Sequence, residues 1–212
     1  MSGRAVHRHA LALSVGLMLV FAPQGAAARA DFQRESPSAP AQELADWAVH
    51  SGDPGGRPFA IVDKVHARVF VFDGAGRLLG AAAALLGLAR GDASVAGIGQ
   101  RRLSEIRPEE RTTPAGRFVA TLASSLTGED ILWIDYENAV ALHRVVDTGT
   151  REQRLRRLDR GTPAQRRITY GCINVPVRFF EDVVAPAFLG GQGIVYVLPE
   201  SGSWRAVFGR KG

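Results

Sequence analysis

The sequence predicts a mostly β fold, a sandwich or barrel-like sheet with short flanking helices. Short runs rich in β-branched and aromatic residues recur along the chain, and turns containing glycine or proline separate them. Helical periodicity is confined to short segments. Of the 212 residues, the 182 that follow the first thirty are enough for one domain with a sizeable core.

Residues 1–30 resemble a signal peptide. A positive start with Arg4 and Arg8 precedes an apolar run over residues 10–22, which is shorter than the roughly 20 residues that a membrane-spanning helix needs. Small residues at Ala28 and Ala30 suit signal peptidase, so we expect cleavage after Ala30, with Ala28 as the second choice. The alternative is an uncleaved anchor. We expect an exported protein with no stable membrane insertion after cleavage.

The N-terminal half of the mature chain begins with a polar, proline-bearing linker at residues 31–40, within a flanking region that ends at residue 56. Leu44, Trp47 and Ala48 have helical spacing in a short helix that Gly52 ends. Strands are predicted at 59–62 and 67–72, with a turn at 73–76. Residues 77–88 form a third strand or, because of their alanines, a helix.

In the C-terminal half, a Thr-Pro-Ala-Gly turn at 113–116 precedes a strand through Leu122. Residues 131–135 and 139–143 form a predicted hairpin, and residues 167–170 a short strand before a glycine-cysteine turn. Pro176 suits the first turn of a helix, which we expect to end or kink before Pro186. The predicted elements end with a buried strand at 193–198 and a tail from residue 200 to 212.

Positive charge is concentrated in one segment. The first thirty residues carry three arginines and no acid, so the net charge falls from +5 to +2 after cleavage. Residues 144–167 hold eight arginines and three acids. Aromatic residues are absent from this arginine-rich insertion, so no nucleic-acid partner is expected. The insertion is either a solvated loop, which is the simpler interpretation, or a lid or dock for an anionic partner.

Cys172 is the only cysteine in the chain. An exported domain normally pairs its cysteines, so a single one is either a small buried hydrophobe or a working thiol. Gly171 beside it and the helix that begins near Pro176 favour the thiol, because a helix N-terminus stabilises a thiolate. We therefore expect Cys172 to be reachable by solvent, with a pKa below that of free cysteine, and amides around Gly171 to hold an oxyanion.

Three histidines follow the expected cleavage site. His50 ends a helix and His66 lies in a turn, so both read as solvated surface residues. His143 ends an apolar strand and is the best candidate for a general base, although a core histidine bonded to the backbone is the alternative. We expect it within hydrogen-bonding reach of Cys172, or one water away, across 29 residues of sequence. No cluster has metal-ligand spacing.

Thr169-Tyr170-Gly171-Cys172-Ile173-Asn174 resembles the signature of the L,D-transpeptidase catalytic domain (YkuD-like), which has Ser or Thr, then Gly-Cys, an apolar residue, and Arg or Asn. The Thr-Pro-x-Gly-x-Phe turn at 113–118 and the upstream His143 follow the family's order. The resemblance covers residues 57–199, and it departs from many members at two positions. Tyr170 stands where they have histidine, and Asn174 where they have arginine.

The resemblance implies a cell-envelope enzyme acting on peptidoglycan stem peptides. Cys172 would attack the carbonyl of an L-to-D-centre bond, usually diaminopimelate–D-alanine, and pass the acyl group from a thioester to an amine or to water. His143 would be the base, oriented by the backbone carbonyl of Arg144, and Gly171 with the Cys172 amide would form the oxyanion site.

The resemblance also implies substrate contacts beside the nucleophile, from Thr169, Tyr170 and Asn174, and it implies no metal or organic cofactor. Two alternatives to transpeptidation remain. One is an L,D-carboxypeptidase or amidase that hydrolyses a peptidoglycan linkage. The other is a wall-binding protein with a dead site, because resemblance in fold does not guarantee chemistry.

Overall fold

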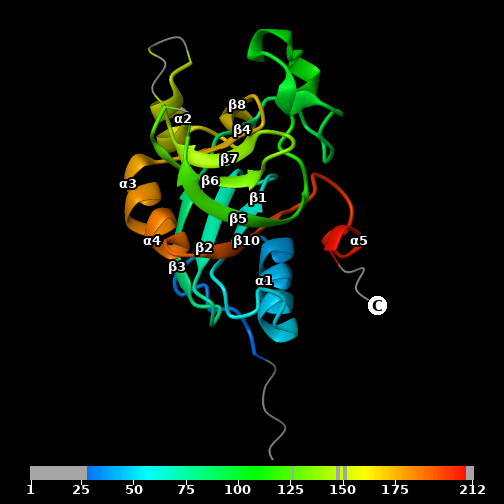
Figure 1. Cartoon of the computed structure of the whole chain (residues 1–212). Coiled ribbons are helices and arrows are strands. Elements are labelled where there is room, and N and C mark those ends of the chain that lie inside the picture. Colours follow the sequence, from blue (N-terminus) through cyan, green and yellow to red (C-terminus); the bar gives the residue numbers. More distant parts are fainter. Residues whose placement is uncertain (1–27, 126, 147–148, 150–151, 209–212) are drawn as a thin grey trace, which may run out of the picture.

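A computed structural model describes residues 28–125, 127–146, 149 and 152–208 of the chain (Figure 1). Most of the predicted signal peptide, residues 1–27, lies outside the described residues. Among the described residues, no helix is both long and apolar enough to cross a bilayer. The predicted fold class is confirmed: one curved eight-stranded sheet dominates, and the helices are short.

The main sheet has the strand order β3-β2-β1-β10-β5-β6-β7-β9. Its pairs are antiparallel except β1 with β10 and β7 with β9, which are parallel. Its strands are β1 (Phe59–Asp63), β2 (Arg68–Phe72), β3 (Leu78–Ala83), β5 (Gly116–Ser124), β6 (Asp130–Asp135), β7 (Val140–Arg144), β9 (Ile173–Val175) and β10 (Gln192–Val197). A second, two-stranded sheet pairs β4 (Leu86–Gly87) with β8 (Arg167–Thr169).

The two edges of the main sheet meet beside the predicted site. Leu85 follows edge strand β3, and Asn174 lies in the other edge strand, β9. The Leu85 N–H donates to Asn174 O at 2.8 Å, and the Asn174 N–H donates back to Leu85 O at 2.9 Å. Residues 77–88 thus form strands rather than the helix that their alanines allowed, because this pairing satisfies their backbone groups.

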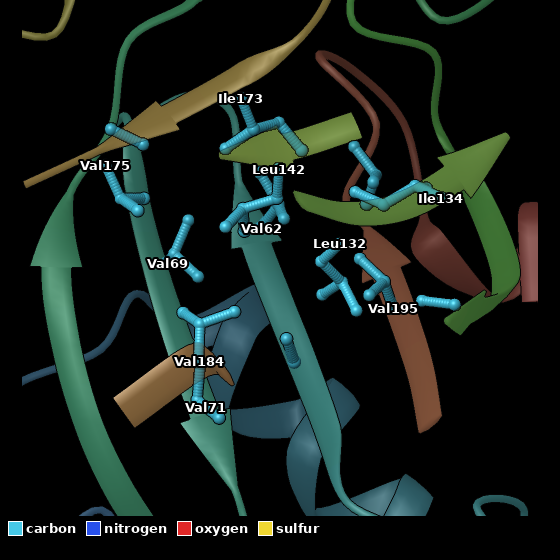
Figure 2. Packing of buried hydrophobic residues seen from close by; sticks show 14 of the residues in the cluster. Val62, Val69, Val71, Leu132, Ile134, Leu142, Ile173, Val175, Val184 and Val195 are labelled. Atoms are coloured by element: carbon cyan, nitrogen blue, oxygen red, sulfur yellow. The ribbon is translucent and has the colours of Figure 1, made fainter. Parts of the chain in front are cut away.

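Alternation along the strands divides the apolar side chains between two cores. The first core lies on the concave side of the sheet, where valines, leucines and isoleucines of several strands meet the helical segment after Pro176. Figure 2 shows its centre, formed by Val62, Val69, Val71, Leu132, Ile134, Leu142, Ile173, Val175, Val184 and Val195. Strands β1, β2 and β10 bury both faces, so they read as continuous apolar runs.

The second core lies on the outer face of β1, β2 and β10, under helix α1 (Ala39–Ser51). Gly52 ends α1 in a left-handed conformation, as predicted. Parts of the expected linker and tail also belong to this core. Phe32 packs edge-on against Phe70 and Phe72, and helix α5 (Trp204–Phe208) buries both of its terminal aromatic side chains.

The helical segment after Pro176 was expected to end or kink before Pro186. It does not end there, since helical structure continues through this proline, but a π-helical turn interrupts the α-helix just before it. Helix α3 (Val177–Phe179) runs into a π-helical turn (Phe180–Val184) and then into α4 (Ala185–Phe188). A π-turn is one of the local irregularities found where a helical hydrogen-bond ladder is interrupted, and proline interrupts it here.

Two further segments frame the site. Residues 98–110 form three short 3-10 helices, η1 (Ile98–Gln100), η2 (Leu103–Glu105) and η3 (Pro108–Glu110), the green group at the upper right of Figure 1. The arginine-rich insertion contains α2 (Arg154–Arg160) and the 3-10 turn η4 (Ala164–Arg166). Leu158 of α2 is buried with Leu85 and Val145, which anchors the insertion to the sheet.

Candidate active site

Cys172 lies between β8 and β9, on a turn that requires glycine before it. Gly171 has φ +139°, and a Cβ atom there would lie 2.8 Å from Thr112 O. Any side chain would therefore push the turn away from the Thr-Pro segment. The local sequence thus fixes the backbone of the candidate nucleophile.

Thr113, in the predicted Thr-Pro turn, ties this turn to the rest of the fold. Its fully buried hydroxyl donates to Gly171 O at 2.8 Å and accepts the Gly87 N–H at 2.9 Å. One side chain therefore joins the segment of β4 to the glycine-cysteine turn. This contact explains why two motifs 58 residues apart act as one unit.

His143 and Asn174 are direct neighbours on the parallel pair β7–β9. The residues just before them, Leu142 and Ile173, are also paired and point into the core. Strand alternation therefore turns His143 and Asn174 toward the opposite side. Cys172 lies one residue before β9, in the turn that leads into that strand.

The thiol of Cys172 and the imidazole of His143 each form hydrogen bonds with other groups rather than with each other. Cys172 Sγ donates to Ala139 O at 3.6 Å, near the start of β7. His143 Nδ1 lies 2.8 Å from Arg144 O, which is the expected backbone contact, and so carries the proton. The unprotonated Nε2 then accepts from Asn174 Nδ2 at 3.0 Å. Asn174 thus occupies the lone pair that a base would use.

The arginine-rich insertion reaches this group through Arg154. Its Nη1 donates to Asn174 Oδ1 at 3.0 Å, and its side chain is only 13% exposed. Its Nε is bonded to Glu152 Oε2 at 2.5 Å. For this part of the insertion the expectation of a solvated loop was wrong, because Arg154 and Leu158 are both held against the domain. Arg151 lies outside the described residues.

Burial governs the charge state of both candidate catalytic groups. It raises the pKa of the Cys172 thiol, and a backbone hydrogen bond from Ala141 opposes this only in part. Burial also lowers the pKa of His143; the bond to Arg144 O raises it, and the nearby charge of Arg154 lowers it. The expectation of a depressed Cys172 pKa is therefore wrong for this resting arrangement.

Cys172 faces a small pocket between its turn and residues 94–112. The pocket combines apolar side chains with the guanidinium of Arg101, and its lining residues are Ser94, Ile98, Gly99, Arg101, Leu103, Ile106, Thr112, Asn138, Ala139, Val140, Tyr170, Gly171 and Cys172. The Arg111 guanidinium stacks 4.0 Å above the Tyr170 ring. Tyr170 therefore lines the pocket with its ring face held against Arg111.

The other predicted residues of the turn hold its shape. The Gly171 N–H donates to Thr169 Oγ1 at 3.2 Å, and that hydroxyl donates to Cys172 O at 2.6 Å. The Gly171 amide is thus engaged in this structure rather than open to an oxyanion. Thr169 and Asn174 are both buried, so neither is in a position to meet a substrate without movement.

The two other histidines after the expected cleavage site lie at the surface, as expected. His50 is exposed at the end of α1, and His66 is 54% exposed and pairs with Asp63 at 2.9 Å. Within the described part of the chain, no group of three or more His, Cys, Asp or Glu side chains could hold a metal ion. Sequence reasoning did not find Arg154, because nothing in the pattern distinguishes it from the other arginines of the insertion.

Comparison with known proteins gives distant structural likenesses. No protein-family model matches the sequence, and the curated proteins give no match either. The chain is similar to the helical cell shape determining protein Pgp2 from Campylobacter jejuni, with 14% identity and a TM-score of 0.45 over 69% of this chain. It is also similar to the LD transpeptidase LdtMt1 solved with imipenem, with 14% identity and a TM-score of 0.39 over 66% of this chain.

A third similar structure is a fused Zn-dependent amidase/peptidase/peptidoglycan-binding domain-containing protein from Clostridium acetobutylicum. Its identity is 18% and its TM-score 0.38 over 77% of this chain. The chain spans 49%, 58% and 63% of the lengths of these three proteins, in the order given.

Proposed function

We propose that this protein is a cysteine acyltransferase of the cell envelope that acts on peptidoglycan stem peptides through a Cys172 thioester. One observation carries the proposal: Cys172 faces a pocket at the start of β9, the strand whose Asn174 pairs with His143 of β7. The resemblance of the sequence around Cys172 to L,D-transpeptidases supplies the substrate class. The expected signal peptide supplies the compartment.

The resting protonation state suits general-base catalysis. A thiol whose pKa is raised keeps its proton until it attacks, and a neutral imidazole can accept that proton as the C–S bond forms. Before this step, Sγ leaves Ala139 O, and the Asn174 amide moves off His143 Nε2. Backbone amides of the turn then hold the oxyanion.

The tetrahedral intermediate collapses by breaking the C–N bond, and the leaving amine takes the proton from the imidazolium. A D-amino acid departs, and the acyl group remains on sulfur as a thioester. An amine then attacks the thioester to form a cross-link or an exchanged terminus; His143 takes the proton that this amine loses and passes it to the thiolate released when the C–S bond breaks. Water in place of the amine gives the hydrolytic products of a carboxypeptidase or amidase.

The pocket beside Cys172 offers one charge to a stem peptide, which carries free carboxylates. Arg101 lines this pocket, and it is also bonded to Glu110 at 3.1 Å. Ile98, Leu103 and Ile106 supply apolar surface beside it. We expect the substrate carboxylate to approach Arg101 while the scissile carbonyl lies over Sγ.

The test is incubation of the purified protein with peptidoglycan fragments, followed by mass spectrometry. Release of a terminal D-amino acid with new cross-links or exchanged termini identifies a transpeptidase, whereas release alone identifies a hydrolase. The Cys172→Ala variant, matched in size and fold, should lose all products. Products of equal yield from this variant would rule out a thioester on Cys172.

A wall-binding protein without catalysis is the second candidate. The observation that favours it is the engagement of both groups elsewhere, Sγ with Ala139 O and Nε2 with Asn174. This candidate requires pull-down on isolated sacculi without any chemical change in their fragments. Detection of an acyl adduct on Cys172 in the same incubation would exclude it.

A further inference from the structure

Arg154, Asn174 and His143 form a continuous chain of hydrogen bonds from the arginine-rich insertion to the candidate base. The links are Arg154 Nη1 to Asn174 Oδ1 at 3.0 Å and Asn174 Nδ2 to His143 Nε2 at 3.0 Å. The far ring nitrogen is bonded to Arg144 O. Asn174 is 1% exposed, so solvent does not replace either of its bonds.

These hydrogen bonds all donate in one direction, from Arg154 to Asn174 and from Asn174 to His143, because a guanidinium only donates hydrogen bonds. Arg154 therefore fixes the oxygen of the Asn174 amide on its own side and turns the NH₂ group toward His143. An NH₂ group facing Nε2 is compatible with neutral imidazole and incompatible with imidazolium, which needs an acceptor there. Without Arg154, the amide is free to rotate and present its oxygen to a protonated Nε2.

We propose that Arg154 is a positioning residue that keeps His143 neutral by fixing the orientation of the Asn174 amide. Arg154 thus sets the proton affinity of His143 without touching it. The role of His143 as a base rests on the proposed function; the coupling between the three side chains does not. Arg154 then serves to keep the base neutral in the resting state.

Other charged groups around His143 come from each element packed near it. Arg144 follows it on β7 and pairs with Glu181 of the π-turn at 3.0 Å. Glu129, just before β6, acts in the opposite sense to Arg154 on the pKa of His143. Glu152 is paired with Arg154. The test must therefore separate the amide's orientation from the direct charge of Arg154.

The experiment is an NMR titration of the ring nitrogens of ¹⁵N-labelled histidine, with the His143 signals assigned from their loss in His143→Gln. Arg154→Met should raise the pKa of His143 by about one pH unit, because an imidazolium then gains a hydrogen-bond acceptor. Arg156→Met is the matched control. Arg156 lies on the same helix, is exposed and bonds only to Gln153 Oε1 among the described residues, so its loss should leave the titration unchanged.

The decisive arm repeats Arg154→Met in an Asn174→Ala background. If the effect passes through the amide, the shift disappears there; a shift of the same size in both backgrounds would mean that charge alone acts and would overturn the proposal. No shift in the parent background would also overturn it. Arg154→Gln, which is too short to reach Asn174, replaces Arg154→Met if circular dichroism shows that the latter unfolds. The titration needs no substrate, so its result does not depend on whether the transpeptidase assay succeeds.

Discussion

Burial favours the uncharged forms of the Cys172 thiol and the His143 imidazole. It raises the pKa of Cys172 and lowers that of His143, so the two changes act together against a thiolate–imidazolium pair. The glycine-cysteine turn could be predicted from local sequence, and the contact of His143 with Arg144 O from the family resemblance. The bond between Asn174 and Arg154 could not, because it joins strand β9 to the insertion through side-chain orientations that no spacing encodes.

Alkylation of folded protein by iodoacetamide should therefore need a higher pH than alkylation of a free thiol. A thiolate is the reactive form, so a raised pKa moves the midpoint of the rate profile above the value of about 8.5 for free cysteine. The single cysteine makes the measurement specific to this site. Protein unfolded in guanidinium is the control and should return the midpoint to about 8.5. A midpoint near neutral pH in the folded protein would show that a thiolate–imidazolium pair forms after all.

At the scale of elements, the candidate site is built from two turns that contact each other. The Thr-Pro turn before β5 and the glycine-cysteine turn before β9 meet through Thr113, whose two hydrogen bonds are buried. The sequence predicted both turns and the strands that follow or precede them. It did not predict η1, η2 and η3, because single-turn helices carry too few residues for a helical period to emerge.

Replacing Thr113 by Val should destabilise the protein by about 2–6 kcal/mol. Valine keeps the shape but leaves the Gly87 N–H and the Gly171 carbonyl buried without their partner, at a cost of about 1–3 kcal/mol each. Urea unfolding followed by tryptophan fluorescence measures the loss. Thr113→Ser retains the hydroxyl and is the control, with an expected loss of about 1 kcal/mol for the missing methyl group. Equal losses in the two variants would contradict a role for these bonds.

Across the whole molecule, the sheet closes on itself and buries two cores. The alternation of apolar residues predicted where the strands lie, and both faces of β1, β2 and β10 are filled as their continuous apolar runs suggest. Strand order and closure depend on pairing between distant segments, such as Leu85 with Asn174, which periodicity cannot reveal. The contribution of the N-terminal segment escaped prediction for the same reason. Its polar, proline-bearing sequence gave no sign that Phe32 lies in a core.

Phe32→Ala should therefore cost about 3–5 kcal/mol of unfolding free energy, the usual range for a buried phenylalanine. Phe32 is 6% exposed and touches two rings of β2. Leu189→Ala serves as the control, because Leu189 is 75% exposed and its loss should change stability by less than about 0.5 kcal/mol. Thermal or urea unfolding compares the two. Similar small losses in both would restore the view of residues 31–40 as a free linker.

Strand β10 lies between β1 and β5, although it is the last strand of the sheet in sequence. A polypeptide is synthesised from its N-terminus, so the middle of this sheet is completed only after residues 192–197 have been made. Until then, β1 and β5 have no partner on their inner edges, and open edges attract other chains. A nascent chain would therefore lack the middle of this sheet until residues 192–197 have been made. That delay would suit the export across a membrane that we propose for this protein.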